Sequence, residues 1–561
     1  MAEIHPLSLS IFIIITVATL LISIYASRRV RTAGHYYVAG GGVRWFVNGF
    51  AIAGDYLSAA SFLGITGLIA FAGYDGFIYA IGFLAGWIVA LFLVAMPLRA
   101  IGKYTFADAL TTKFKSRSIR LMAAISTLVV SVFYLIPQMV GSGSIVGPLI
   151  GLDYEVGVII IGGLVVFIVA TAGMVSTTWV QFIKGFLLLI AVIGLTVGVL
   201  WVAGMGPFEF IGEIINSNIT LPSGAQVTGE AFMSPGLKYK DPLDFVSLSM
   251  ALILGTAALP HILIRYFTVP KPADARKSTV VAIIVMGIFY LLILFLGLGA
   301  IYFFNQGATG VINPADANLT APLLAQYIGG DVFYAIISSI AFATILGTVS
   351  GLIMASAGAI AHDIYAEVLK KKMDEKRALR ISKLTAVGVG IIAIFLGILS
   401  KGQNVAFLVG LAFAIAASAN LPALLCTLFW KRTSEMGLVL GIAAGLISSI
   451  LLIVISPTMM GSGAIFSLNN PGIISIPLGF AVTVVGWWFV LVALELPRRF
   501  HSIGTHIINS LIALALFWGL YRSTGLLLAL LRRVGRRGSG RIPGSGWIND
   551  QVAFAAEQIT R

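Results

Sequence analysis

The chemically most informative residues stand inside a long apolar stretch, residues 47–72, which contains GFAIAGDYLSAASFLGITG. It holds four polar side chains at close spacing: Asp55, Tyr56, Ser58 and Ser61. A lone carboxylate in an apolar helix is costly unless it faces water, an ion or a protein partner. Gly54 precedes it, so an interruption of the helix is expected here. The alternative interpretation is a small-residue face for close helix packing, which Asp55 and Tyr56 make the weaker of the two.

A second stretch, residues 332–362, holds Thr344 and Thr348 with Gly347 beside them. Residues four apart share one face of a helix. Two hydroxyls on such a face, together with carbonyls freed by a break in a neighbouring helix, could coordinate a hard cation. The alternative is that each hydroxyl bonds the carbonyl four residues back in its own helix.

Further polar residues stand in other apolar stretches. His261 directly follows Pro260, and proline can interrupt a helix and free polar backbone near a ring able to donate to a carboxylate. A structural role for this histidine is equally compatible with the sequence. Ser418 and Asn420 suggest a polar lining in residues 404–429. Lys184 is interpreted as a side chain that reaches back to the cytoplasmic interface.

The elements that position these residues are membrane-spanning helices. Of 561 residues, 59% are apolar and only 10% are charged, which excludes a soluble protein and a disordered one. A spanning helix needs about 20 apolar residues. Thirteen such segments are predicted: 7–26, 47–72, 75–98, 121–149, 155–173, 179–204, 243–266, 278–305, 332–362, 384–400, 404–429, 437–456 and 474–494. The expected fold is therefore all-α and polytopic. The single Cys426 excludes an intrachain disulfide and a thiolate metal cluster.

The net charge of +14 is explained by topology rather than by nucleic-acid binding. Alternate connections are rich in Lys and Arg, most densely residues 370–383, whereas the opposite loops are acidic. The positive-inside rule then places the N-terminus outside. Residues 503–531 are predicted to be a helix in the cytoplasmic interface, and the Gly/Ser/Arg-rich end is predicted to be disordered.

Four separated motifs resemble the sodium:solute symporter family: GDYLSAASFLGITG, GTAALPHILIRYFTV, ATILGTVSGLIMASAGAIAHDIY and NVAFLVGLAFAIAASANLP. The sequence is most similar to the acetate permease branch, which carries short monocarboxylates, and the similarity spans about residues 5–495. It implies a leucine-transporter-type core of two inverted five-helix repeats, about 47–204 and 243–429. A transporter domain of residues 1–495 and a separate part of residues 496–561 are therefore expected.

The resemblance also implies site residues. The family's common sodium site maps onto the carbonyls of Gly54 and Leu57 and onto Thr344, Gly347 and Thr348. Relatives often have Ala followed by two consecutive hydroxyl residues where this chain has Thr, Gly and Thr. Relatives that bind an additional sodium carry an Asp where this chain reads Thr177, Thr178 and Trp179, so no such additional site is expected. The expected substrate-binding residues are Asp55, Tyr56, Ser58, Ser61, His261, Ser418 and Asn420.

The function expected from these observations is symport of a small monocarboxylate such as acetate with Na⁺, in the plasma membrane. Two alternatives stay open: proton coupling with Asp55 or His261 as carrier, and sodium symport of another small solute such as an amino acid. A haem enzyme needs facing histidines inside the membrane, and only His261 is expected to lie deep, so no enzyme is predicted. Na⁺, the solute and lipid are the expected partners, without any other cofactor and without nucleic acid. Lys184 and Arg265 are both expected near cytoplasmic ends, which leaves neutral donors, helix dipoles and the bound cation to hold the anion.

Overall fold

The computed structural model describes residues 39–101, 104–169, 174–370 and 375–499, with a few positions between 9 and 25. The described chain is helical apart from one antiparallel hairpin, in which β1 (Asn218–Thr220) pairs with β2 (Gln226–Thr228). Two compact units are separated at residues 487/488, and the first of them is described below. The expected boundary at 495/496 falls inside α21, which runs from Gly472 to Arg499, and most of residues 496–561 lies outside the described residues.

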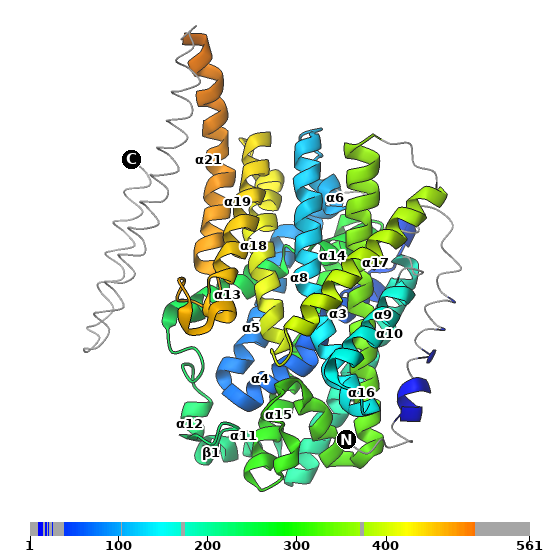
Figure 1. Ribbon diagram of the computed structural model, residues 1–561, viewed down its shortest axis with the longest axis vertical. Coiled ribbons are helices and arrows are strands. Elements are labelled where there is room, and N and C mark those ends of the chain that lie inside the picture. The colour runs from blue at the N-terminus through cyan, green and yellow to red at the C-terminus, as the bar shows by residue number, and fades with distance from the viewer. Residues whose placement is uncertain are drawn as a thin grey trace, which may run out of the picture. The chain divides into compact units, whose positions relative to one another are not determined.

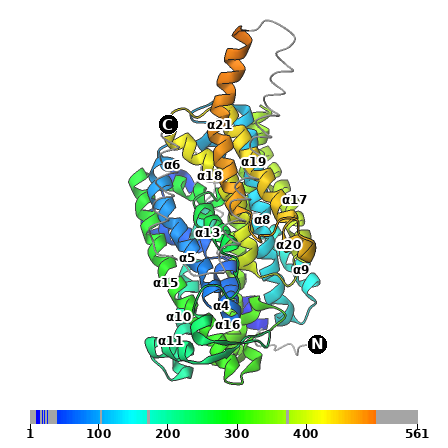
Figure 2. The same ribbon diagram turned by 90° about the vertical axis from the view of Figure 1, so that its left-hand side faces the viewer.

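The helices follow one another along the chain with short connections (Figures 1 and 2). The first half comprises η1 (Ala39–Gly41), α3 (Trp45–Tyr56), η2 (Ala60–Gly64), α4 (Ile65–Ala72), α5 (Tyr74–Val89), η3 (Ala90–Val94), α6 (Ala95–Ile101), α7 (Phe106–Leu110), α8 (Arg117–Ile150), α9 (Tyr154–Val169), α10 (Met174–Ala203), α11 (Pro207–Asn216) and α12 (Gly229–Phe232). The second half comprises α13 (Pro242–Thr256), α14 (Pro260–Leu263), η4 (Ile264–Thr268), α15 (Pro272–Asn305), η5 (Thr309–Val311), η6 (Ala317–Leu319), α16 (Thr320–Ala357), η7 (Gly358–Val368), α17 (Glu375–Leu399), α18 (Val405–Phe429), α19 (Glu435–Val454), α20 (Pro457–Met460), η8 (Gly461–Gly463) and α21.

Within the described residues, 9 helices are long and apolar enough to cross a membrane, or 10 when α3 and the helix after its break count as one span. Each predicted segment from 47–72 to 474–494 overlaps one or more helices. Residues 170–173 and most of the segment 7–26 lie outside the described residues. Large apolar side chains are exposed on the outer faces of these helices, including Phe92 on η3 and Ile391 on α17, which are 69% and 62% exposed. Lipid tails cover such surfaces, so the chain is a multi-pass membrane protein.

The first break interrupts the span that carries Asp55. Helix α3 ends at Tyr56, Leu57 is extended (ψ 90°), and the helix that resumes at Ala60 is bent by 62° relative to α3. A Cβ at Gly54 would collide with the carbonyl of Gln181 on α10, so glycine allows the two backbones to meet just before the break. The predicted interruption at this place is confirmed.

The second break lies between α13 and α14, at residues 257–259. Leu259 is extended (ψ 116°) and Pro260 begins the next short helix, as the sequence predicts. The carbonyl of Ala258, freed by the break, accepts a hydrogen bond from Asn420 Nδ2 at 3.0 Å. The buried side-chain amide of Asn420 therefore supplies a hydrogen-bond donor to a backbone carbonyl that the break leaves without a partner in its own helix.

Two other features shape the ends of the spans. Helix α16 is kinked at Gly329 and Gly330, the latter with φ 66°, so its straight part starts there. On the opposite side from the basic loops, the buried carboxylate of Asp75 accepts backbone N–H groups of Gly236, Lys238 and Tyr239 at 3.0, 2.6 and 2.9 Å. That carboxylate fixes the loop between α12 and α13 onto α5.

Candidate ion and substrate site

A fully buried ionic cluster lies at the first break. Asp55, the penultimate residue of α3, accepts hydrogen bonds from Arg265 Nε at 2.9 Å and from Gln181 Nε2 at 3.0 Å. Neither Asp55 nor Arg265 has solvent exposure. The carboxylate therefore meets the expectation for an ionisable group inside a membrane, because it is paired with a cation and hydrogen-bonded. These two hydrogen bonds connect α3, which carries Asp55, to η4, which carries Arg265, and to α10, which carries Gln181.

Arg265 lies three residues before the end of its span, close to that end as expected, but its side chain does not reach an interface. The span that carries it continues to Thr268 and turns its guanidinium into the protein. Nη1 donates to Thr178 Oγ1 at 2.9 Å, whereas Nη2 has no hydrogen-bond partner among the described residues. A buried N–H donor without a partner costs free energy, and a guanidinium is able to donate to an anionic group.

Lys184 corrects an expectation from the sequence. Its side chain does not reach an interface: it is 2% exposed, and Nζ donates to Thr348 Oγ1 at 3.1 Å. Helix α10 begins at Met174 rather than at the predicted residue 179, which puts Lys184 about 15 Å along it at a rise of 1.5 Å per residue. The polar residues Thr178, Gln181 and Lys184, spaced by three, were the sequence signal for a buried polar face on this helix.

The residues expected on α16 divide into two kinds. Thr348 Oγ1 donates to the Asp55 carbonyl at 3.3 Å, and the Gly347 carbonyl accepts from Gln181 Nε2 at 2.6 Å, so both lie at the break. Thr344 Oγ1 instead donates to the carbonyl of Ile340 at 2.8 Å, which is the alternative that its helical position allowed. Gly54 and Leu57, which the resemblance assigns to a cation site, lie beside the same break.

The other side chains expected around Asp55 are buried and mostly paired. Tyr56 Oη and Thr256 Oγ1 are 2.7 Å apart, Ser61 Oγ and Tyr290 Oη are 3.0 Å apart, and Ser58 Oγ accepts the N–H of Ala60 at 3.3 Å. These pairs connect the two breaks and α15.

His261 differs from them. It is buried against Tyr134, with ring centroids 5.1 Å apart, and neither ring nitrogen has a hydrogen-bond partner among the described residues. A buried polar group without a partner costs free energy. A ligand that hydrogen-bonds the ring would remove that cost.

The last two expected residues lie apart. Ser418 Oγ donates to the carbonyl of Ala414 and is 2.7 Å from Ser475 Oγ of α21, so it lies on the side of α18 that faces α21. Asn420 accepts from Ser126 Oγ of α8 while it donates to Ala258. The structure therefore separates Ser418 from the Asp55 cluster and assigns Asn420 to the support of the second break.

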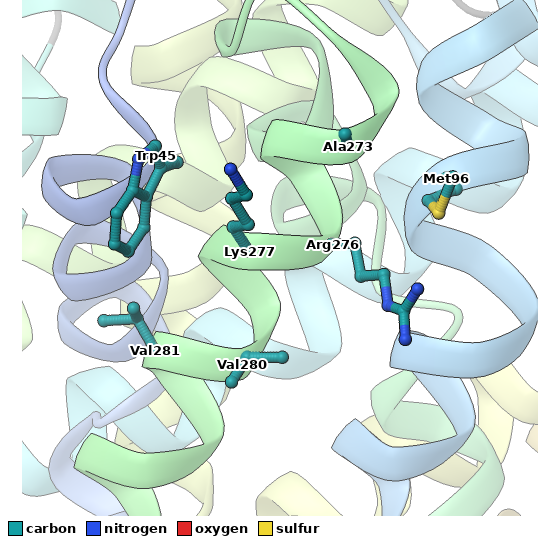
Figure 3. Close-up of a pocket in the computed structure, with 7 residues that line it drawn as sticks. All are labelled: Trp45, Met96, Ala273, Arg276, Lys277, Val280 and Val281. Carbon is teal, nitrogen blue, oxygen red and sulfur yellow. The ribbon is translucent and has the colours of Figure 1, made fainter.

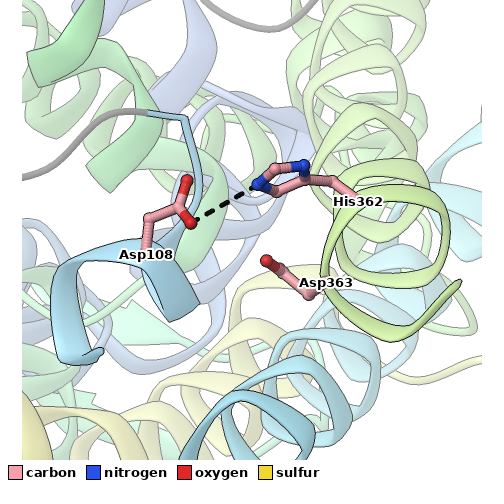
Figure 4. A group of neighbouring side chains, drawn as sticks. All are labelled: Asp108, His362 and Asp363. Carbon is pink, nitrogen blue, oxygen red and sulfur yellow. Dashed lines mark hydrogen bonds and ion pairs between the residues drawn. The ribbon is translucent and has the colours of Figure 1, made fainter. Parts of the chain in front are cut away.

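A second polar cluster was missed in the sequence. Arg120 Nη1 lies 2.7 Å from Asp108 Oδ1 and 3.0 Å from Asp363 Oδ1, and His362 Nε2 lies 3.4 Å from Asp108 (Figure 4). Burial raises the pKa of Asp108, but the hydrogen bond and charge of His362 and those of Arg120 outweigh it and lower the pKa to about 2. The three ligand-type side chains are close enough to hold a metal ion, yet Arg120 already neutralises both carboxylates. The cluster ties α7 and α8 to η7.

An open cavity of about 370 Å³ lies between α3, α6 and α15 (Figure 3). Its lining residues are Trp45, Met96, Ala273, Arg276, Lys277, Val280 and Val281. None of them belongs to the Asp55 cluster. The cavity is open at the surface of the protein, where Trp45 and Met96 are exposed, and the buried cluster is the better candidate for a transport site.

The sequence model of the sodium:solute symporter family matches residues 36–445. YwcA of Bacillus subtilis (strain 168), an uncharacterized symporter, is 46% identical over 479 residues, which cover 84% of this chain and 92% of YwcA. The chain belongs to the sodium:solute symporter family. It is accordingly a transporter, because its family is one of transporters rather than of enzymes.

Solved structures support the same fold. A substrate-bound, outward-open Na⁺-coupled sialic acid symporter superposes with a TM-score of 0.67 at 16% identity, covering 86% of this chain and 98% of the other. The nucleobase-cation-symport-1 transporter Mhp1, in a closed conformation, gives a TM-score of 0.51 at 12% identity, covering 86% and 99%. The core of this symporter therefore has the leucine-transporter-type arrangement of inverted repeats, and its two breaks fall in the first helix of each repeat.

Proposed function

We propose that this symporter moves a small monocarboxylate such as acetate together with Na⁺ by alternating access, across a plasma membrane and with the N-terminus outside. The observation that supports an anionic substrate best is the charge balance of the buried cluster. It contains one carboxylate, Asp55, and two basic side chains, Arg265 and Lys184. An additional negative charge is favoured in such a low-dielectric site.

The unused donors indicate where that negative charge binds. Arg265 Nη2 and the ring nitrogens of His261 are buried and have no partner among the described residues. The two residues are four positions apart, one turn of helix, directly after the second break. A carboxylate that accepts from both would satisfy donors that the protein leaves open. The guanidinium of Arg265 is thereby added to the neutral donors, helix dipoles and bound cation expected from the sequence.

Sodium coupling is supported by the family and by the oxygen atoms at the first break. Thr348 Oγ1 and the carbonyl of Asp55 lie on facing elements, and oxygen ligands of this type suit a hard cation. A cation held there is close to a carboxylate bound at Arg265. Each ligand therefore lowers the free energy of binding the other, and the two effects must be equal.

The proposal is tested by calorimetric titration of acetate into purified protein with Na⁺ and with choline in its place. We expect Na⁺ to tighten acetate binding by about 5- to 150-fold, the range of typical coupling free energies, and acetate to tighten Na⁺ binding by the same factor. Equal acetate affinity in both salts would contradict the shared site. It would favour proton coupling or another small solute.

The two threonines of α16 provide a matched pair for the cation. We expect Thr348→Ala to weaken apparent Na⁺ affinity by about tenfold, the equivalent of about 1.4 kcal/mol for a lost ligand. Thr344→Ala removes a hydroxyl that bonds its own helix, so its Na⁺ affinity should stay near the wild-type value. The measurement is the Na⁺ dependence of acetate uptake at saturating acetate. Equal effects of the two substitutions would contradict this assignment.

A further inference from the structure

The side chain of Lys184 crosses from α10 to the face of α16 that the family's cation site uses. Its ammonium is 3.1 Å from Thr348 Oγ1. A Cβ built on Gly347 would lie 2.8 Å from Lys184 Cδ and 3.0 Å from Nζ. Glycine at 347 therefore leaves the space through which this lysine passes.

An oxygen atom with no partner lies at the same place. Gln181 Oε1 is buried and has no hydrogen-bond partner among the described residues, and it is 2.7 Å from the Cβ built on Gly347. The orientation of this amide follows from its neighbours, because Nε2 donates to two acceptors, Asp55 Oδ1 and the carbonyl of Gly347. Gln181 Oε1 is therefore an oxygen atom that is able to serve as a ligand for a hard cation at this place.

The ammonium and a free cation would therefore use the same small region. Three ionisable groups interact electrostatically with Lys184. Asp55 attracts a positive charge on the lysine, whereas Arg265 repels it. The third group is the buried ring of His261. Two unit positive charges a few ångströms apart repel by more than the free energy of a tenfold change in affinity, even at the effective dielectric constant of a protein. A sodium ion cannot bind at Thr348 with full affinity while the ammonium stays there.

We propose that Lys184 is a tethered cation that competes with Na⁺ at Gln181 Oε1, Thr348 Oγ1 and the Asp55 carbonyl. The structure holds the state in which the lysine occupies the site. Sodium binding requires the ammonium to move off Thr348, so Lys184 keeps the Na⁺ affinity low. This inference rests on the sodium coupling of the proposed function.

The test is a Na⁺ titration of the full-length purified protein at constant ionic strength and pH, with choline as the replacing cation and thermal stabilisation as the readout. The variants are Lys184→Met, which removes charge and hydrogen bond, and Lys184→Gln, which keeps a donor for Thr348 without the charge. Lys401→Met is the matched control, because Lys401 is 56% exposed and pairs with Glu155. Arg265 and Gln181 still contact Asp55 in both variants at 184, so the carboxylate keeps a cationic partner.

We expect both variants at 184 to bind Na⁺ at least about tenfold more tightly than the wild type, and Lys401→Met to match the wild type. Unchanged or weaker Na⁺ affinity in a folded Lys184→Met or Lys184→Gln protein would overturn the inference. Failure of the proposed function gives a different result: wild-type acetate uptake into proteoliposomes would then proceed equally well without Na⁺.

Discussion

Asp55→Asn is expected to reduce acetate uptake by about a hundredfold while the protein still reaches the membrane in normal amounts. The amide cannot neutralise Arg265 and Lys184, so the charge balance of the proposed site is lost, and a hundredfold loss corresponds to about 2.8 kcal/mol. Insertion is unaffected, because a neutral amide is cheaper to bury than a carboxylate. Uptake of labelled acetate into vesicles, normalised to the amount of protein in the membrane, measures this.

Asp153→Asn is the matched control, because Asp153 is an exposed carboxylate before α9 and its replacement should leave uptake unchanged. Near-normal uptake by Asp55→Asn would show that the buried carboxylate only packs the helices. Loss of the protein from the membrane would show instead that Asp55 is needed for assembly.

Arg265→Lys is expected to weaken acetate binding by about tenfold or more, although it keeps the positive charge. The planar guanidinium donates to Asp55 and Thr178 and still has an N–H group for a carboxylate. The ammonium of lysine cannot reproduce this fixed arrangement of donors. Calorimetric titration of acetate in the presence of Na⁺ gives the affinity. The control is Arg276→Lys, an exposed position on α15. Wild-type acetate affinity in Arg265→Lys would remove the guanidinium from the substrate site.

The spans and both helix breaks could be predicted from the sequence, because they depend on local chemistry. Long apolar stretches must span, Pro260 cannot continue a helix hydrogen-bond ladder, and Gly54 next to Asp55 indicated the interruption that α3 shows. The resemblance to the family rests on four motifs, two of which contain these breaks.

The partners of Asp55 could not be predicted in this way. The sequence predicts Lys184 and Arg265 at interfaces because both lie within a few residues of a predicted helix end. Helix α10 starts five residues earlier than predicted, which changes the depth of Lys184 by about 7.5 Å. Thr344 and Thr348 share a helical face, and their tertiary contacts distinguish them: Thr348 contacts Asp55 and Lys184, whereas Thr344 bonds its own helix. The ion cluster around Asp108 joins segments more than 200 residues apart, which no local pattern reveals.

The most direct test of the central claim is uptake of labelled acetate into proteoliposomes with the Na⁺ gradient and the pH gradient imposed separately. Liposomes without protein correct for diffusion of the neutral acid, and Asp55→Asn proteoliposomes provide the inactive control. We predict that an inward Na⁺ gradient at equal pH drives accumulation of acetate above the outside concentration, and that a pH gradient without Na⁺ does not. Accumulation driven by the pH gradient alone, with no response to Na⁺, would contradict sodium-coupled monocarboxylate symport.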